Sequence, residues 1–273
     1  MTNIKHDYIA YRTDENITID GDLNKPVWLK ARKSQRFVDM ASGDPGFYDT
    51  RMACTWNDDF LYIGFWVEEP FVAAELKNRG DTLFKENDIE LFIDGGDCYY
   101  ELEFNAIGTI YEMFFIWRDA YKRGSRFDVP EFDLIDRNAY SFAGDFDRNP
   151  DSFWDGTHKR GARWAFRDCE FPRLEVAVQV QGTLNDNSDV DDGWTAELAL
   201  PWSSMEWLRN DRSLPPKDGD VWGMFFGRFQ KLMNAGQEIQ PHPAWVLKPH
   251  GKYDTHQPEC FPQVCFVDKA LNL

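Results

Sequence analysis

The sequence predicts an all-β fold, an antiparallel two-sheet β-sandwich of the jelly-roll kind with one or two short helices. Many short segments alternate apolar and polar side chains and are separated by turn residues, which is the period of half-buried strands. Helical signals are too few for a fold that alternates strands and helices. The 273 residues, 42% of them hydrophobic, contain no repeat or linker, so we expect a single domain over 1–273.

The first elements lie before residue 70. We expect an opening strand over 8–19, a short helix that starts near Pro26 and strands over 51–56 and 60–69. The loop over 70–86 carries Phe84 and leads into a hairpin.

The hairpin over 87–108 is the most regular part of the sequence. If Gly95 and Gly96 form its two-residue turn, Ile89 and Leu91 lie on an apolar face. That register sets Glu90 opposite Glu101 and Asp88 opposite Glu103 on the other face. Like charges opposite each other cost stability unless a cation or a hydrogen-bond donor meets them.

Strands also follow the hairpin. A strand over 110–119 has aromatic side chains on both faces, which predicts that it is covered on both sides. Residues 120–168 form the least patterned part, and we expect an irregular insertion there. The remaining predicted elements are strands over 173–182, 193–202, 218–231, 243–247 and 263–267, and a short helix over 202–210.

Charge and composition exclude several classes of partner. The net charge of −17 disfavours nucleic acid and anionic membrane surfaces, and no apolar stretch is long enough to span a membrane. Five cysteines without CxxC spacing do not predict a zinc site. We expect a monomer or weak homodimer, extracellular or periplasmic if a signal peptide has been removed and otherwise cytoplasmic.

Several segments resemble the family 9 carbohydrate-binding modules of the DOMON-like superfamily, in the order that this family has them. They are DGDLNKPVW, LYIGFWVEEP, NDIELFID with YELEFNAIG, GWTAELALPW, DGDVWGMFFGRF, and PAWVL with HQPECFPQVCFV. The resemblance covers most of the chain outside 120–168. It implies a two-sheet sandwich without catalytic activity that binds oligosaccharides or polysaccharides as an accessory module of glycan degradation.

The resemblance also suggests site residues. Phe84 stands where the family has a tryptophan that stacks on the sugar, and Glu103, two residues before Asn105, stands where it often has an arginine. The second stacking tryptophan falls near Tyr253 and His256, where this chain has none. The family often carries structural calcium, but the residues alone assign no ligands to such an ion and no other cofactor.

The predicted site therefore combines the polar face of the hairpin with loop aromatics. Carboxylates and an amide can hydrogen-bond vicinal hydroxyls, and aromatic rings can stack on a sugar. The candidate ligand-binding residues are Phe84, Glu90, Glu103, Asn105, Arg228, Tyr253 and His256. Trp66 and Trp245 could stack too, although core packing is the simpler interpretation.

Other interpretations of the acidic face stay open at this point. It could be a solvated face balanced by Arg228, or a metal site. It could also be the acid pair of a glycoside hydrolase, because same-face neighbours on a strand lie ~7 Å apart, close to the ~6.5–9.5 Å of inverting enzymes. The superfamily also includes haem binders, but Met113 and His6 do not make a convincing ligand pair for haem.

Overall fold

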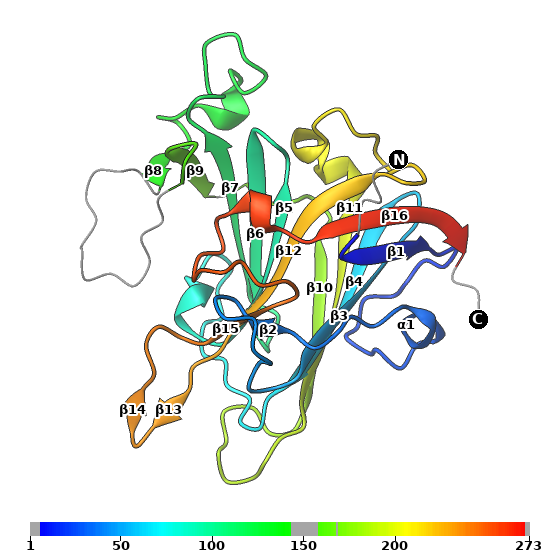
Figure 1. The fold of residues 1–273 in the computed structure, drawn as a ribbon, viewed down its shortest axis with the longest axis vertical. Coiled ribbons are helices and arrows are strands. Elements are labelled where there is room, and N and C mark those ends of the chain that lie inside the picture. Colours follow the sequence, from blue (N-terminus) through cyan, green and yellow to red (C-terminus); the bar gives the residue numbers. More distant parts are fainter. Residues whose placement is uncertain (1–5, 143–157, 168, 271–273) are drawn as a thin grey trace.

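The computed structural model describes residues 6–142, 158–167 and 169–270, and it confirms the all-β sandwich. Two sheets pack face to face (Figure 1). In the first sheet the strand order is β10 (Glu175–Gln181), β11 (Gly193–Pro201), β4 (Phe60–Glu68), β3 (Thr50–Trp56), β1 (Tyr8–Arg12), β16 (Gln263–Ala270). In the second it is β12 (Val221–Phe229), β5 (Asp88–Asp94), β6 (Cys98–Phe104), β7 (Ile110–Trp117), β9 (Arg163–Arg167), β8 (Tyr140–Phe142).

Smaller elements complete the described part of the chain. The short strands β15 (Ala244–Val246) and β2 (Val38–Asp39) extend the second sheet beside β12, and β13 (Met233–Asn234) pairs with β14 (Gln237–Glu238) in a separate hairpin. Helix α1 spans Pro26–Lys30. Short 3₁₀ turns lie at Leu83–Lys85, Pro130–Phe132, Trp202–Ser204, Glu206–Leu208 and Pro258–Cys260. None of the helices in the described ranges is long and apolar enough to cross a membrane.

Two strands depart from a simple antiparallel sandwich. Strand β1 runs parallel to both of its neighbours, β3 and β16. Strand β12 belongs to both sheets: Val221–Gly223 pair with β16, and Met224–Phe229 pair with β5. The predicted antiparallel sandwich therefore has parallel pairings at β1, and the two sheets are joined by hydrogen bonds along β12.

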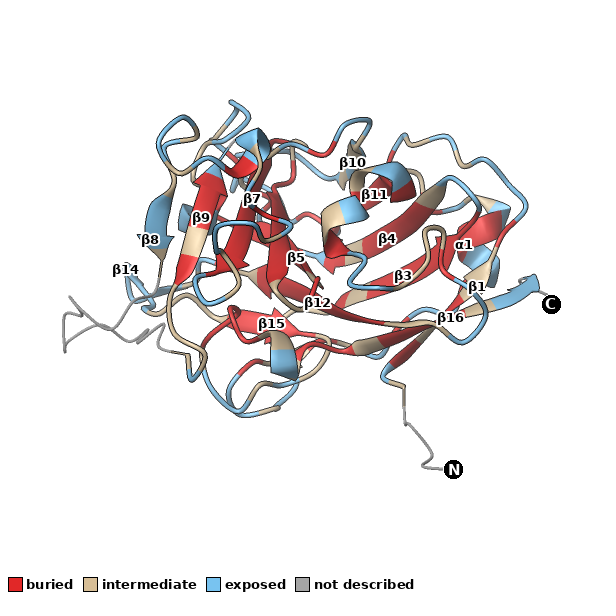
Figure 2. Cartoon of the chain, turned by 90° about the horizontal axis from the view of Figure 1, so that it is seen from above, coloured by how far each residue is buried: buried red, intermediate tan, exposed pale blue. Residues whose placement is uncertain are grey.

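The main core lies between the sheets, and a second apolar cluster lies on the outer face of the second sheet. The strands of both sheets are largely buried (Figure 2). Alternation along β7 explains the two layers, since Phe114 and Ile116 point into the sandwich while Phe115 and Trp117 point outward. The prediction that this strand is covered on both sides is confirmed. The outer layer underlies the candidate site.

The central hairpin has the predicted faces but a different register. Its turn is formed by Gly96 and Asp97, because Gly95 already pairs with Cys98. Glu90 consequently lies opposite Glu103, and Glu101 lies opposite Phe92. Both expected pairs, Glu90 with Glu101 and Asp88 with Glu103, are wrong. The faces survive because the pairing shifts by two residues, one full strand period.

The segment over 120–168 is less irregular than predicted. It contains β8 and β9, and β9 extends the second sheet beyond β7. Residues 143–157 and 168 of this predicted insertion lie outside the described residues.

Candidate binding pocket

A pocket of about 610 Å³ lies on the outer face of the second sheet. Strands β5, β6 and β7 form its floor, and the loops near Phe84, Gln240 and Thr255 form its rim. Five of the seven predicted site residues line it: Phe84, Glu90, Glu103, Tyr253 and His256. The pocket therefore brings together the predicted acids of the hairpin and the predicted loop aromatics.

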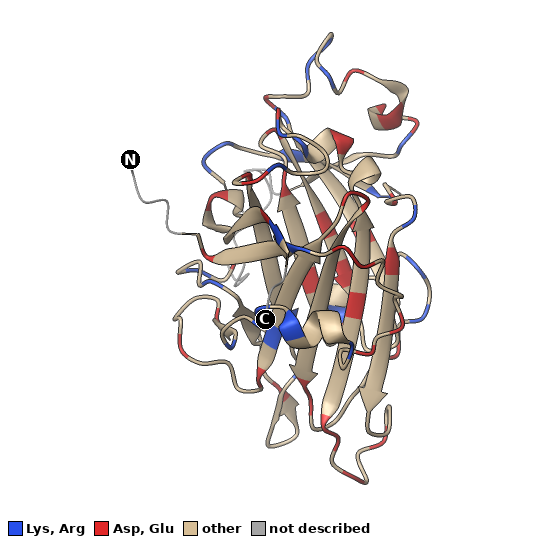
Figure 3. Cartoon of the chain, turned by 90° about the vertical axis from the view of Figure 1, so that its right-hand side faces the viewer, with Lys and Arg blue, Asp and Glu red and all other residues tan. Residues whose placement is uncertain are grey.

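Four acids lie on this face of the hairpin, and all are almost completely buried. Asp88, Glu90, Glu101 and Glu103 have exposed fractions of 5% or less. Figure 3 shows acidic positions on the strands of the sheet as well as in the loops. Glu101 and Glu103 hydrogen-bond to each other, and Oε2 of Glu103 accepts a hydrogen bond from the backbone N–H of Phe84 at 2.9 Å.

Burial decides the protonation of these acids. It raises the pKa of Glu103 to about 8. Burial, and then repulsion from Asp88 and Glu103, raises the pKa of Glu90 well above its usual range. The pKa of Glu101 and that of Asp88 are also raised, first by burial and then by the neighbouring acids. The site therefore holds its carboxyl groups largely protonated near neutral pH.

Aromatic rings form the walls of the pocket. Phe84 is 44% exposed, and its ring meets Tyr111 edge-on at a centroid distance of 6.1 Å. Tyr253 packs edge-on against Phe229 and donates its hydroxyl to the carbonyl of His242 at 2.6 Å. Flat rings beside polar groups suit the two kinds of surface that a sugar presents.

His256 lies under the pocket rather than at its mouth. Its Nε2 is 4.0 Å from Oε1 of Glu101, and its Nδ1 is 3.2 Å from the hydroxyl of Tyr99. Burial, and then the positive charge of Arg163, lowers the pKa of His256 well below its ordinary value. The imidazole is therefore neutral at pH 7 and gives Glu101 no compensating charge.

Asn105 has a structural role next to the pocket. Its Nδ2 donates to the carbonyl of Leu76 at 2.9 Å and to Oε1 of Glu86 at 2.6 Å. Its Oδ1 accepts from the backbone N–H groups of Ile107 and Thr109. Asn105 does not line the pocket but ties the loop that carries Phe84 to the hairpin.

The prediction that Arg228 lies beside the acids is wrong. Arg228 is opposite Ile89 in the ladder between β12 and β5, so its side chain points into the sandwich, away from Glu90. There its Nη2 is 3.4 Å from Oε2 of Glu69, and its Nη1 donates to Thr50 Oγ1. Gly227, opposite Glu90, occupies the outward position instead.

Sequence reasoning missed much of the pocket lining. Tyr111 and Phe115 could have been found, because they alternate with core residues on a strand already expected to be covered on both sides. Tyr140, Phe142 and Arg167 come from the poorly patterned segment, where no sequence signal marked them. The two tryptophans considered as stacking platforms, Trp66 and Trp245, do not line this pocket.

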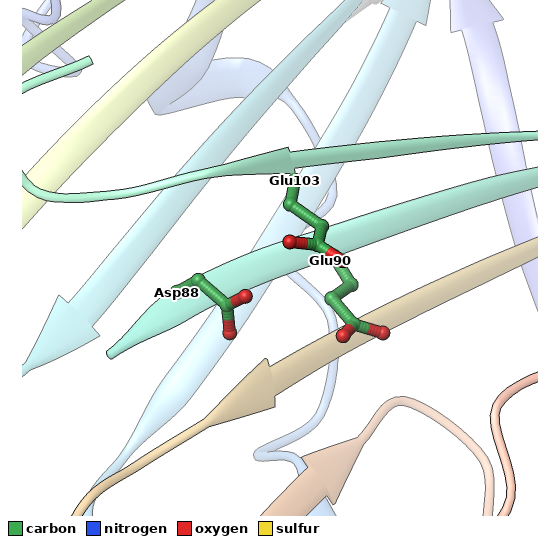
Figure 4. Close-up of side chains that lie close together, drawn as sticks. All are labelled: Asp88, Glu90 and Glu103. Atoms are coloured by element: carbon green, nitrogen blue, oxygen red, sulfur yellow. The ribbon is translucent and has the colours of Figure 1, made fainter. Parts of the chain in front are cut away.

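Three of the acids are close enough to share an ion. Asp88, Glu90 and Glu103 lie close together (Figure 4), and one oxygen of each lies within 4.8 Å of the others. That spacing fits a shell of radius ~2.4 Å, but calcium takes six to eight oxygens and this group supplies three carboxylates. Both oxygens of Asp88 and Oε2 of Glu90 are buried without a hydrogen-bond partner.

The overall fold is that of family 9 carbohydrate-binding modules. A Bacteroides uniformis protein provisionally assigned to carbohydrate binding superposes with a TM-score of 0.55 at 14% identity, over 94% of this chain and 97% of its own. A family 9 module from Caldicellulosiruptor kristjanssonii, in complex with cellotriose, has a TM-score of 0.51 at 11% identity and coverage of 96% and 95%. Its glucose complex has a TM-score of 0.51 at 12% identity and coverage of 97% and 98%. No protein-family model and no curated protein sequence matches the chain.

Proposed function

We propose that this chain is a non-catalytic carbohydrate-binding module that recognises an oligosaccharide or polysaccharide in the pocket on its second sheet. The carrying observation is the juxtaposition of the exposed ring of Phe84 with the carboxyl groups of Glu90 and Glu103 in one pocket. The likeness of the fold to modules solved with cellotriose and glucose supports the same interpretation. The role that follows is to hold an enzyme of glycan degradation on its substrate.

The protonation pattern favours binding over catalysis. A glycoside hydrolase needs one protonated acid and one ionised carboxylate at the scissile bond. Here burial raises the pKa of all four acids in the row, and none is lowered. We expect no release of reducing sugar from polysaccharides, and release that is lost in Glu103→Gln would contradict the proposal.

Isothermal titration against mono- and oligosaccharides tests the binding proposal. We expect at least one ligand from the panel, and loss of its binding when Phe84→Ala is combined with Glu90→Ala. Removal of a stacked ring and of a buried hydrogen-bond partner each costs about 1–3 kcal/mol, enough together to abolish a weak interaction.

Phe71→Ala is the matched control. Phe71 is 46% exposed, a fraction similar to that of Phe84, but it lines a separate cavity of about 570 Å³. Affinity should be unchanged in Phe71→Ala. A folded wild-type protein that binds no sugar in the panel would refute the proposal, and a loss confined to Phe71→Ala would move the site to the other cavity.

A further inference from the structure

Acidic side chains greatly outnumber lysine and arginine in the pocket lining. The described lining contains five acidic side chains but only one lysine, Lys85, and one arginine, Arg167. The acidic residues are Glu90, Glu101, Glu103, Glu238 and Asp254. A neutral sugar would leave the buried carboxyl groups holding protons, whereas a positively charged ligand could take the place of those protons and pair with the ionised carboxylates.

No lysine or arginine in the described ranges forms an ion pair with the acids on the floor. Within the described part of the chain, these acids have one close contact with a basic side chain. It is the 4.0 Å contact between Glu101 and His256, whose imidazole is neutral. Arg228 points to the other side of the sheet. Oε2 of Glu90 is buried without a hydrogen-bond donor, although Glu90 lines the pocket and lies directly opposite Glu103. An occupant with several N–H donors would satisfy it.

The walls restrict what that occupant can be. The rings of Phe84, Tyr111 and Tyr253 offer faces for the C–H groups of a sugar and for a neighbouring positive charge. Resting on the proposed function, we propose that the pocket selects an amino sugar, a hexosamine unit whose free amino group is protonated and binds between Glu90 and Glu103. An ammonium group brings three donors and one positive charge to the carboxyl groups, where a hydroxyl brings one donor.

A divalent cation is the competing occupant. Asp88, Glu90 and Glu103 could contribute one oxygen each, but the aromatic walls contribute none of the remaining oxygens that calcium requires. An amine uses both the carboxyl groups and the rings, so it accounts for more of the lining.

The experiment compares β-1,4-linked glucose oligomers of equal length that differ only at C2: hydroxyl in cello-oligosaccharides, acetamide in chito-oligosaccharides and free amine in their deacetylated forms. Titrations of the chelator-treated full chain are run at about pH 6, below the ~7.7–8.0 at which a weakly basic amino group loses its proton. We expect the amine series to bind at least about tenfold more tightly than both others. The ratio of dissociation constants should fall to about 1 in Glu90→Gln.

Glu206→Gln is the control for the change in total charge, because Glu206 pairs with Arg209 on the surface. Its ratio should equal that of the wild type. Equal affinities for the three series, or a preference unchanged in Glu90→Gln, would overturn the amine proposal and leave sugar binding intact. Absence of binding in all three series would count against the proposed function itself. Calcium that binds the chelator-treated protein and is needed for sugar binding would assign the acids to the metal.

Discussion

At the scale of single residues, the unusual feature is a pair of buried acids that lie opposite each other in the hairpin. Glu90 and Glu103 lie directly opposite in the ladder, and both are almost fully buried. Desolvation and mutual repulsion both favour the protonated form, so the free protein relieves the conflict by holding protons. The sequence predicted the acidic face, since alternation alone sets it. It could not predict the depth of burial, because the covering loops are distant in the chain.

Glu103 should therefore make stability depend on pH. Its pKa is about 8 in the folded protein and 4.5 as the ordinary value, so between these values the native state binds the proton and the unfolded chain does not. Stability contributed by this group falls as pH rises from about 4.5 to about 8. Glu103→Gln mimics the protonated form and should gain thermal stability relative to the wild type by roughly 3 °C or more from pH 5 to pH 9.

The measurement is the melting temperature of both proteins across that range by calorimetry. The difference between them isolates this group, because the other titrating residues are shared. A difference that stays constant with pH would show that Glu103 keeps an ordinary pKa in the folded state.

At the scale of elements, the loop before the hairpin is held by side chains of the hairpin itself. Asn105 binds Leu76 and Glu86, and Glu103 accepts the N–H of Phe84. The sequence marked Asn105 as polar and near the acids, but whether its amide serves a ligand or a loop depends on where the loop folds back. The prediction for Arg228 fails for a related reason. Alternation along β12 separates its residues into two faces, but it does not show which face lies beside the acids.

Asn105→Ala should weaken sugar binding from outside the pocket. Loss of its buried hydrogen bonds should lower the free energy of unfolding by about 1–3 kcal/mol and loosen the loop that carries Phe84. Asn57→Ala is matched, because Asn57 is also buried and accepts two backbone N–H bonds, from Asp59 and Phe60, in the turn between β3 and β4. Urea unfolding should show a loss in both variants, and titration should show reduced affinity only in Asn105→Ala. Unchanged affinity there would mean that the loop does not need this anchor.

At the scale of the whole molecule, one buried polar cluster joins the two sheets. Glu69 follows β4 of the first sheet and meets Arg228 from β12, and its carboxylate also accepts from Trp194 and Asn87. Burial lowers the pKa of Arg228 to about 10, and Glu69 opposes that shift. The two-sheet sandwich followed from the alternating strands and from the resemblance to known modules, whereas the parallel placement of β1 depends on contacts too distant in the chain to read from alternation.

Arg228→Met should destabilise the fold without affecting the pocket. It leaves the carboxylate of Glu69 buried without its cation, which typically costs about 3–5 kcal/mol. Arg209→Met, which removes an exposed pair with Glu206, should change stability by about 0.5 kcal/mol or less. Urea unfolding measures both. Titration should give wild-type sugar affinity for Arg228→Met, and a selective loss of affinity would restore Arg228 as a ligand.

The passage of β12 from one sheet to the other has a consequence for cooperativity. Its first residues are hydrogen-bonded to β16 and its later residues to β5, the strand that carries Asp88 and Glu90. Opening of the pocket floor would therefore disturb both sheets, because exposing β5 frees Met224–Phe229 of β12, and the remaining residues of that strand, Val221–Gly223, pair with β16 of the first sheet. A ligand that stiffens the floor would raise amide-exchange protection in the first sheet as well, so occupancy is communicated through the hydrogen bonds of the backbone.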